Sequence, residues 1–162
     1  MSTADKNLSH YDKDKIPNAK DFRFGIVVSE WNDDITEPMY HGAVEALLNN
    51  GAHIENIITQ HVPGSFELVY GSKKMQEQSV NAVIAIGSVI RGETAHFDYV
   101  CQAVSHGIKD LNIRHDTPVI FCVLTDDNHQ QAKDRSGGKH GNKGIEAAIA
   151  AIKMAELRKN LR

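Results

Sequence analysis

The sequence VNAVIAI at residues 80–86 is the clearest indication of the fold class. It is apolar at nearly every position, which predicts a strand that is covered on both of its faces. Central strands of parallel sheets are buried in this way, whereas strands of antiparallel sheets usually alternate between apolar and polar residues. The stretch therefore indicates an α/β protein with this strand near the centre of its sheet.

Similar patterns lie on both sides of this stretch. Apolar residues that alternate or run together predict strands over residues 22–28, 54–60 and 118–124. Thr36 is a plausible helix N-cap with Pro38 in the first turn, and the Asn-Asn-Gly sequence at 49–51 ends that helix. Further helices are predicted over residues 66–78, around 97–111, over 128–135 up to the break at Gly137 and Gly138, and from about 145 onward.

Strands and helices therefore alternate along the chain. Such an order predicts a parallel sheet with helices on both faces and right-handed crossovers. We expect a flavodoxin-like three-layer α/β sandwich with a four-stranded sheet in the order 2-1-3-4, formed by a single domain over residues 21–162. Residues 1–20 mix Lys and Asp without an apolar run, and we expect them to be a flexible N-terminal tail.

Composition limits the classes of function. The net charge of -3 and the pI near 6.3 argue against a nucleic-acid partner, which usually requires a basic surplus. No secretory signal is present, and the apolar run at 80–90 is shorter than the roughly 20 residues that span a bilayer, so we expect a cytoplasmic protein with no membrane partner. Cys101 and Cys122 form no CxxC pair and read as reduced thiols, and the nine histidines include no HxxxH or HxH pair, so no metal site is expected.

Ligands of open parallel sheets bind beyond the carboxyl ends of the strands. The loops expected there are residues 29–32, 61–67, 87–96 and 125–128. The third runs from the buried strand into a helix, whose N-terminus attracts phosphate. Thr94 could add a hydroxyl donor there or simply cap the helix. His96 could carry protons at neutral pH, or it could be an ordinary surface histidine.

Three other segments offer binding groups. Pro63 and Gly64 set a tight turn, so that the backbone of Ser65 and Phe66 can face a ligand, while Glu67 could bind hydroxyls or stabilise a helix start. Trp31 follows the first strand and could stack on a flat ring or lie at a subunit interface. The glycine-rich segment 134–144 does not match a P-loop, but Arg135 could bind phosphate or remain solvated.

Together these segments resemble the lumazine synthase family of riboflavin biosynthesis. The resemblance runs from about Phe22 onward and rests on four strings in the family's order: PGSFE at 63–67, GSVIRGETAHFDYV at 87–100, QAKDR at 131–135 and GNKG at 141–144. It implies an enzyme, a transferase that condenses 5-amino-6-(D-ribitylamino)uracil with 3,4-dihydroxy-2-butanone 4-phosphate. The product would be 6,7-dimethyl-8-ribityllumazine, with phosphate and water released and no cofactor required.

The resemblance also implies roles for individual residues. His96 would transfer protons, Trp31 would stack on the pyrimidine, and Phe121 would reach the ring site of the neighbouring subunit. Ser65, Phe66 and Glu67 would hold the ribityl chain and the ring, and the same pocket would be lined by Ser88, Val89 and Ile90. The phosphate would be bound by Glu93, Thr94 and Arg135. Ala95 departs from members with a second threonine, and residues 125–128 replace a TTE-type sequence.

The resemblance implies a homopentamer, which in some members is the unit of a hollow icosahedral shell. No insertion separates the Arg135 helix from the last helix, as in shell-forming members. Three alternatives remain open at this stage: a non-catalytic flavin or phosphate-ligand binder on the same fold, a lumazine-dismutating riboflavin synthase, and a cage for storage or scaffolding. The string at 87–100 argues against the first two, and the third is compatible with enzyme activity.

Overall fold

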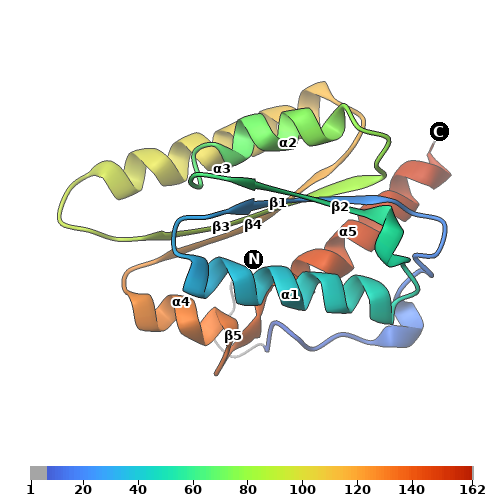
Figure 1. Cartoon of the computed structure of the whole chain (residues 1–162), viewed down its shortest axis with the longest axis horizontal. Coiled ribbons are helices and arrows are strands. Elements are labelled where there is room, and N and C mark those ends of the chain that lie inside the picture. The colour runs from blue at the N-terminus through green and yellow to red at the C-terminus, as the bar shows by residue number, and fades with distance from the viewer. Residues whose placement is uncertain (1–6, 162) are drawn as a thin grey trace.

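A computed structural model describes residues 7–161 of the chain, with one parallel sheet between two layers of helices (Figure 1). The four strands have the order β2-β1-β3-β4, which confirms the predicted fold class and topology. The strands are β1 (Phe24–Ser29), β2 (Ile57–Val62), β3 (Ala82–Ile90) and β4 (Val119–Asp126). A small antiparallel pair is formed by β5 (Ser136–Gly138) and β6 (Gly141–Asn142).

The helices form two layers that cover opposite faces of the sheet. Figure 1 shows α2 and α3 on one face and α1, α4 and α5 on the other. Their bounds are α1 (Asp33–Asn49), α2 (Leu68–Gln76), α3 (His96–Arg114), α4 (His129–Arg135) and α5 (Lys143–Asn160), with short 3-10 turns η1 (Lys13–Lys15) and η2 (Ile54–Asn56).

Each face of the sheet has its own hydrophobic core. Ile26, Ile84 and Ile86 are fully buried on the side of α1 and α5, whereas Val27 and Val83 are fully buried on the side of α2 and α3. Successive residues of a strand point to opposite faces. A central strand in this fold must therefore be apolar throughout, and all six residues of β1 are buried.

The start of α1 differs from the prediction. Thr36 is not the N-cap: the helix begins at Asp33 after Asn32, which adopts the left-handed conformation with φ 60°. Thr36 is buried inside the helix, and its Oγ1 donates a hydrogen bond to the carbonyl oxygen of Ser29 at 2.7 Å. Asp33 and Asp34 occupy the first turn, where acidic groups suit the positive end of the helix dipole. Pro38 consequently lies beyond the first turn.

Other element boundaries shift by a few residues. Strand β3 extends beyond the predicted end at 86 because Val89 and Ile90 stay paired with Thr125 and Asp126 of β4. Strand β2 begins at Ile57, since the preceding residues form η2. The predicted break at Gly137 and Gly138 is part of β5. The predicted loop at residues 87–96 is therefore shorter and covers residues 91–95, and it still lies at the carboxyl edge of the sheet.

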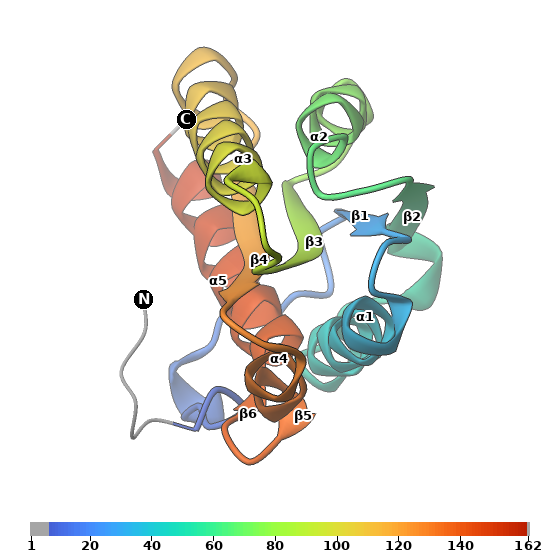
Figure 2. The ribbon, with the colours of Figure 1, turned by 90° about the vertical axis from the view of Figure 1, so that its left-hand side faces the viewer.

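Residues 7–20, which the sequence assigns to the tail, run along the α1 and α5 side of the molecule (Figure 2). The backbone N–H of Leu8 donates to the carbonyl oxygen of His140 at 2.8 Å, and the hydroxyl of Ser9 accepts from the N–H of Asn142 at 2.9 Å. Ala19 is fully buried. The rest of the predicted tail, residues 1–6, lies outside the described residues.

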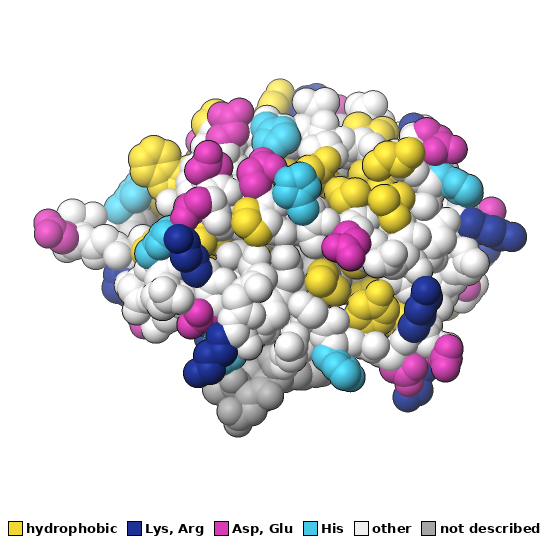
Figure 3. Space-filling model, turned by 60° about the horizontal axis from the view of Figure 1, so that its bottom comes forward, with side chains coloured by type: hydrophobic (Ala, Val, Ile, Leu, Met, Phe, Trp, Pro, Cys, Tyr) yellow, Lys and Arg dark blue, Asp and Glu magenta, His cyan; other side chains and the backbone are white. Residues whose placement is uncertain are grey.

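The surface on the α1 side carries interspersed acidic, basic, histidine and hydrophobic side chains (Figure 3). Within residues 7–161, no helix has the length and the apolar character needed to cross a membrane.

Candidate active site

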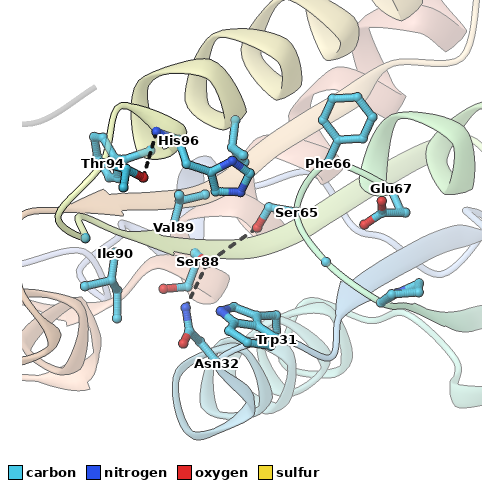
Figure 4. A pocket seen from close by; sticks show the side chains of 15 residues that line it. Trp31, Asn32, Ser65, Phe66, Glu67, Ser88, Val89, Ile90, Thr94 and His96 are labelled. Carbon is cyan, nitrogen blue, oxygen red and sulfur yellow. Dashed lines mark hydrogen bonds between the residues drawn. The ribbon is translucent and has the colours of Figure 1, made fainter.

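A pocket of about 640 Å³ lies beyond the carboxyl ends of β1, β2 and β3, beside the first turn of α3 (Figure 4). This is the edge where the sequence places the ligand. The predicted residues that line it are Trp31, Ser65, Phe66, Glu67, Ser88, Val89, Ile90, Thr94 and His96. The remaining lining residues are Asn32, Pro63, Gly64, Gly92, Phe97 and Val100.

Asn32 also lines the pocket, and no role was predicted for it from the sequence. Its left-handed backbone turns the chain from β1 into α1, a conformation that asparagine adopts more readily than most residues. Its side-chain Nδ2 donates a hydrogen bond to the carbonyl oxygen of Ser88 at 3.1 Å. In the sequence, the only hint of this turn is that an asparagine stands between Trp31 and the pair Asp33-Asp34. Asn32 thereby fixes the Trp31 loop against the end of β3.

Trp31 is held by its backbone rather than by packing of its ring. Its N–H donates to the carbonyl oxygen of Pro63 at 3.2 Å, and its own carbonyl oxygen accepts from the hydroxyl of Ser29 at 3.3 Å. The side chain is 71% exposed. An exposed indole on a fixed backbone offers a flat apolar face for a ring to stack on.

The floor of the pocket is formed where the turn after β2 meets β3. The hydroxyl of Ser65 contacts the carbonyl oxygen of Ser88 at 3.5 Å, and both serines are buried. A Cβ on Gly87 would lie 2.6 Å from Ser65 Oγ, so a larger residue at this position would displace the Ser65 side chain. Ser88 Oγ is buried and has no hydrogen-bond partner among the described residues. A buried polar atom of this kind is stabilised when a ligand supplies the missing bond.

Phe66 and Glu67 follow Ser65 along the rim. Phe66 is 59% exposed, and Glu67 is exposed immediately before α2 begins. Their side chains are therefore accessible to a ligand, as is the backbone of the Pro63-Gly64 turn.

His96 is the first residue of α3, and its ring lies across the pocket from Trp31 (Figure 4). Its backbone N–H donates to Thr94 Oγ1 at 3.4 Å. The N-cap of α3 is Ala95, and its side chain makes no capping bond. The imidazole is exposed, so it can exchange protons with both solvent and ligand.

Three predicted residues lie outside this pocket. Glu93 is exposed in the loop before α3 and is not among the lining residues. Arg135 ends α4, where its Nη1 donates to the carbonyl oxygen of Gln131 at 3.1 Å and lies 3.8 Å from Asp126 Oδ1. Phe121 is 37% exposed and lines a second hollow of about 410 Å³ between α3 and β4. The structure therefore places Arg135 and Phe121 apart from His96 within one chain.

Burial changes the acidity of groups near the carboxyl ends. The buried position of Asp126 raises the pKa of its carboxyl group, although Arg135 acts in the opposite direction. Burial raises the pKa of the Cys122 thiol to about 12 and also raises the pKa of the partly buried Cys101. Both cysteines are free. Among the described residues, no cluster of three or more His, Cys, Asp or Glu side chains is arranged to hold a metal ion.

Comparison with known proteins agrees with this geometry. A family model described as 6,7-dimethyl-8-ribityllumazine synthase matches residues 21–159. A protein of that name from Flavobacterium johnsoniae is 69% identical over 159 residues, covering 98% of this chain and 84% of that protein. A protein of the same name from Christiangramia forsetii is 64% identical over 162 residues, covering 99% of this chain and 96% of that protein. A third protein of this name, from Porphyromonas gingivalis, is 57% identical over 158 residues, covering 97% of this chain and 98% of that protein.

Proposed function

This chain belongs to the 6,7-dimethyl-8-ribityllumazine synthase family of riboflavin biosynthesis and is a transferase, and from that premise we propose its substrates. It condenses 5-amino-6-(D-ribitylamino)uracil with 3,4-dihydroxy-2-butanone 4-phosphate to give 6,7-dimethyl-8-ribityllumazine. The observation that carries the proposal is the pocket of about 640 Å³ whose lining includes Trp31, Ser88 and His96. It offers a stacking face, an unpartnered hydroxyl and a proton carrier around one volume of substrate size.

The chemistry needs few protein groups. The 5-amino group of the pyrimidine attacks the ketone of the butanone and forms a Schiff base with loss of one water. Phosphate then leaves with its C–O electron pair, and ring closure by the ribitylamino nitrogen releases a second water. The amine is itself the nucleophile, so the enzyme contributes mainly by holding the two substrates together. Such positioning lowers a barrier by roughly 7–11 kcal/mol.

Most of the lining residues serve the pyrimidine substrate. Trp31 stacks on the pyrimidine ring, and Ser88 Oγ gains its missing bond from a polar atom of that ring. Ser65, Phe66 and Glu67 hold the ribityl chain at the rim, with Val89 and Ile90 lining the end of β3. His96 moves protons during Schiff base formation and ring closure, for which a general acid–base residue typically contributes about 10²–10⁴-fold.

We also propose that each active site is completed by a second subunit of a homopentamer. None of the residues that line the pocket is Lys or Arg, yet the butanone substrate carries a phosphate that such a side chain would stabilise. Arg135 and Phe121 lie outside the pocket of their own chain. In a ring with head-to-tail contacts, each subunit can lend Arg135 and Phe121 to one neighbour and His96 to the other.

Incubation of the purified protein with both substrates tests the reaction. We expect the fluorescent lumazine to accumulate together with inorganic phosphate, in equal amounts. Folded protein that releases no phosphate and forms no lumazine would overturn the proposed substrates.

Complementation tests the shared site. Arg135→Ala and His96→Ala proteins are assayed alone and then refolded together as mixed rings. Roughly a quarter of the interfaces then carry both native residues under random mixing, and we expect activity above the sum of the two parents. Mixed rings that never exceed the parental average would place both residues in one subunit.

A further inference from the structure

Arg91 is an exposed residue outside the pocket whose side chain contacts two neighbouring segments. It directly follows β3, and its backbone N–H donates to the carbonyl oxygen of Asp126 at 3.0 Å. Its guanidinium carbon lies 4.1 Å from the centre of the Phe97 ring. Its Nη1 and Nη2 contact the two carboxylate oxygens of Asp98 at 3.4 and 3.3 Å, and its Nε contacts Asp127 Oδ1 at 3.1 Å.

These contacts converge on the residues that follow His96. Phe97 and Asp98 are the second and third residues of α3, and His96 is the first. Asp127 belongs to the loop between β4 and α4, which leads to Arg135. Arg91 therefore fixes the first turn of α3 against the ends of β3 and β4. Any rotation of that turn which moved His96 would also break the stacking on Phe97 or the pairing with Asp98.

The geometry requires arginine rather than any cation. A planar guanidinium can lie against a ring while the donors along its edge reach two carboxylates in fixed directions, whereas a compact ammonium group lacks this planar fork. Single exposed ion pairs contribute little to stability. Arg91 is 44% exposed in its side chain, so a large contribution to the free energy of unfolding is not expected from it. The arrangement is better suited to fixing the position of a neighbouring group.

We propose that Arg91 is a positioning residue that sets the place of His96 relative to the pocket, an inference that rests on the proposed function of His96. A misplacement of about 1 Å in an active site can lower a rate about 10²-fold. We therefore expect R91Q to lower kcat by roughly 10- to 100-fold, which corresponds to a misplacement of His96 by up to about 1 Å. The KM for the pyrimidine should change little, because Trp31 and Ser88 are held by other bonds.

A double-mutant cycle separates this role from a general structural one. If Arg91 acts through His96, then R91Q has no further effect once His96 is removed, and the R91Q/H96A protein has the kcat of H96A. R91K restores the charge without the planar stack and should recover only part of the lost kcat. Equal fold losses from R91Q in the native and H96A backgrounds would overturn the proposal.

Arg158 supplies the matched control. Its Nε contacts Asp116 at 2.7 Å, and Nη1 donates to the carbonyl oxygen of Val80, which lies just before β3 at the opposite end of the sheet from the pocket. R158Q should lower Tm at least as much as R91Q while kcat stays unchanged. A parallel loss of kcat in R158Q would show that lost stability, not position, lowers the rate.

A crystal structure of R91Q tests the positioning without reference to activity. We expect residues 91–98 to be displaced or poorly ordered while the sheet and the Trp31 loop are unchanged. A native position of His96 in that structure would overturn the inference even if the protein makes lumazine. Suppose instead that His96 is displaced in R91Q but that the native protein forms no lumazine. This result would reject the proposed function and leave the positioning role of Arg91 intact.

Discussion

The carboxyl group of Asp126 lies buried at the end of β4, and its Oδ2 has no hydrogen-bond partner among the described residues. Burial raises its pKa, so the folded protein binds this proton more tightly than the unfolded chain does. Stability therefore falls as the pH rises from the unfolded pKa, about 3.9, through the raised pKa of the folded state.

Asp126→Asn removes this titration. We expect the difference in unfolding free energy between variant and native protein to grow in favour of the variant across that pH window and then stay constant. The change is about 1.4 kcal/mol for each unit by which the folded and unfolded pKa values differ. Urea unfolding at a series of pH values measures it. A difference independent of pH would contradict the raised pKa.

Cys122 illustrates the same effect on a thiol. Its pKa of about 12 and its complete burial leave almost no exposed thiolate near pH 8. We expect a thiol reagent to modify at most Cys101 in the native protein and both cysteines after unfolding. Cys122→Ala should leave native labelling unchanged and remove one of the two sites after unfolding. Rapid labelling of native Cys122 would show that β4 opens readily.

At the scale of single residues, the sequence predicted most of the pocket because the carboxyl ends of parallel strands converge at one edge. Trp31, Ser65 and His96 meet there although they follow different strands. The contribution of Asn32 was not predictable from hydropathy, since its left-handed backbone is a local choice that an apolar pattern does not reveal. The same conformation explains the misplaced start of α1, because it lets the helix begin before Thr36.

Among the elements, α1 and α5 come into close contact at Gly144. A Cβ added there would overlap the carbonyl oxygen of Met39, which belongs to the backbone and cannot move aside alone. Gly144→Ala should therefore lower the unfolding free energy by about 3 kcal/mol, at the upper end for overpacking. Urea unfolding checks this value.

Gly92 is the matched control for Gly144. Nothing lies within 4 Å of a Cβ added to it, so Gly92→Ala should change the unfolding free energy by less than about 1 kcal/mol. Equal effects at both glycines would contradict the close contact between the helices.

The order of the elements was predictable because alternating strands and helices leave few topologies open. Their exact ends were not, because they depend on pairing between strands. Val89 and Ile90 extend β3 because β4 continues opposite them as far as Asp126. The small β5–β6 pair is too short for an apolar pattern, and its two-glycine sequence reads only as a break.

For the whole molecule, the hollow between α3 and β4 is the surface on which assembly can be tested. Ile113 is 72% exposed and lines this hollow together with Phe121. If subunits of the proposed ring meet there, Ile113→Asp buries an unpaired charge at a cost of several kcal/mol per interface. We therefore expect this variant to dissociate. Analytical ultracentrifugation should show smaller species, with lumazine formation lost in parallel.

Leu161 provides the control for this surface. It is 78% exposed, directly after α5, and does not line the hollow. Leu161→Asp should leave both mass and activity unchanged. An Ile113→Asp protein of native mass would place the subunit contacts elsewhere. Neither composition nor hydropathy along one chain identifies such contacts, because they depend on a surface that another copy covers.

The close packing of α1 against α5 has a consequence for biosynthesis. Met39 belongs to α1 and Gly144 to α5, and three strands of the main sheet with three helices lie between them in the sequence, so α1 is made well before the helix that covers it. At about 5–20 residues per second on the ribosome, the apolar face of α1 waits several seconds for its partner. During translation the apolar side chains of this face, which include Ile35, Met39 and Leu47, therefore stay uncovered by α5 until that helix has emerged.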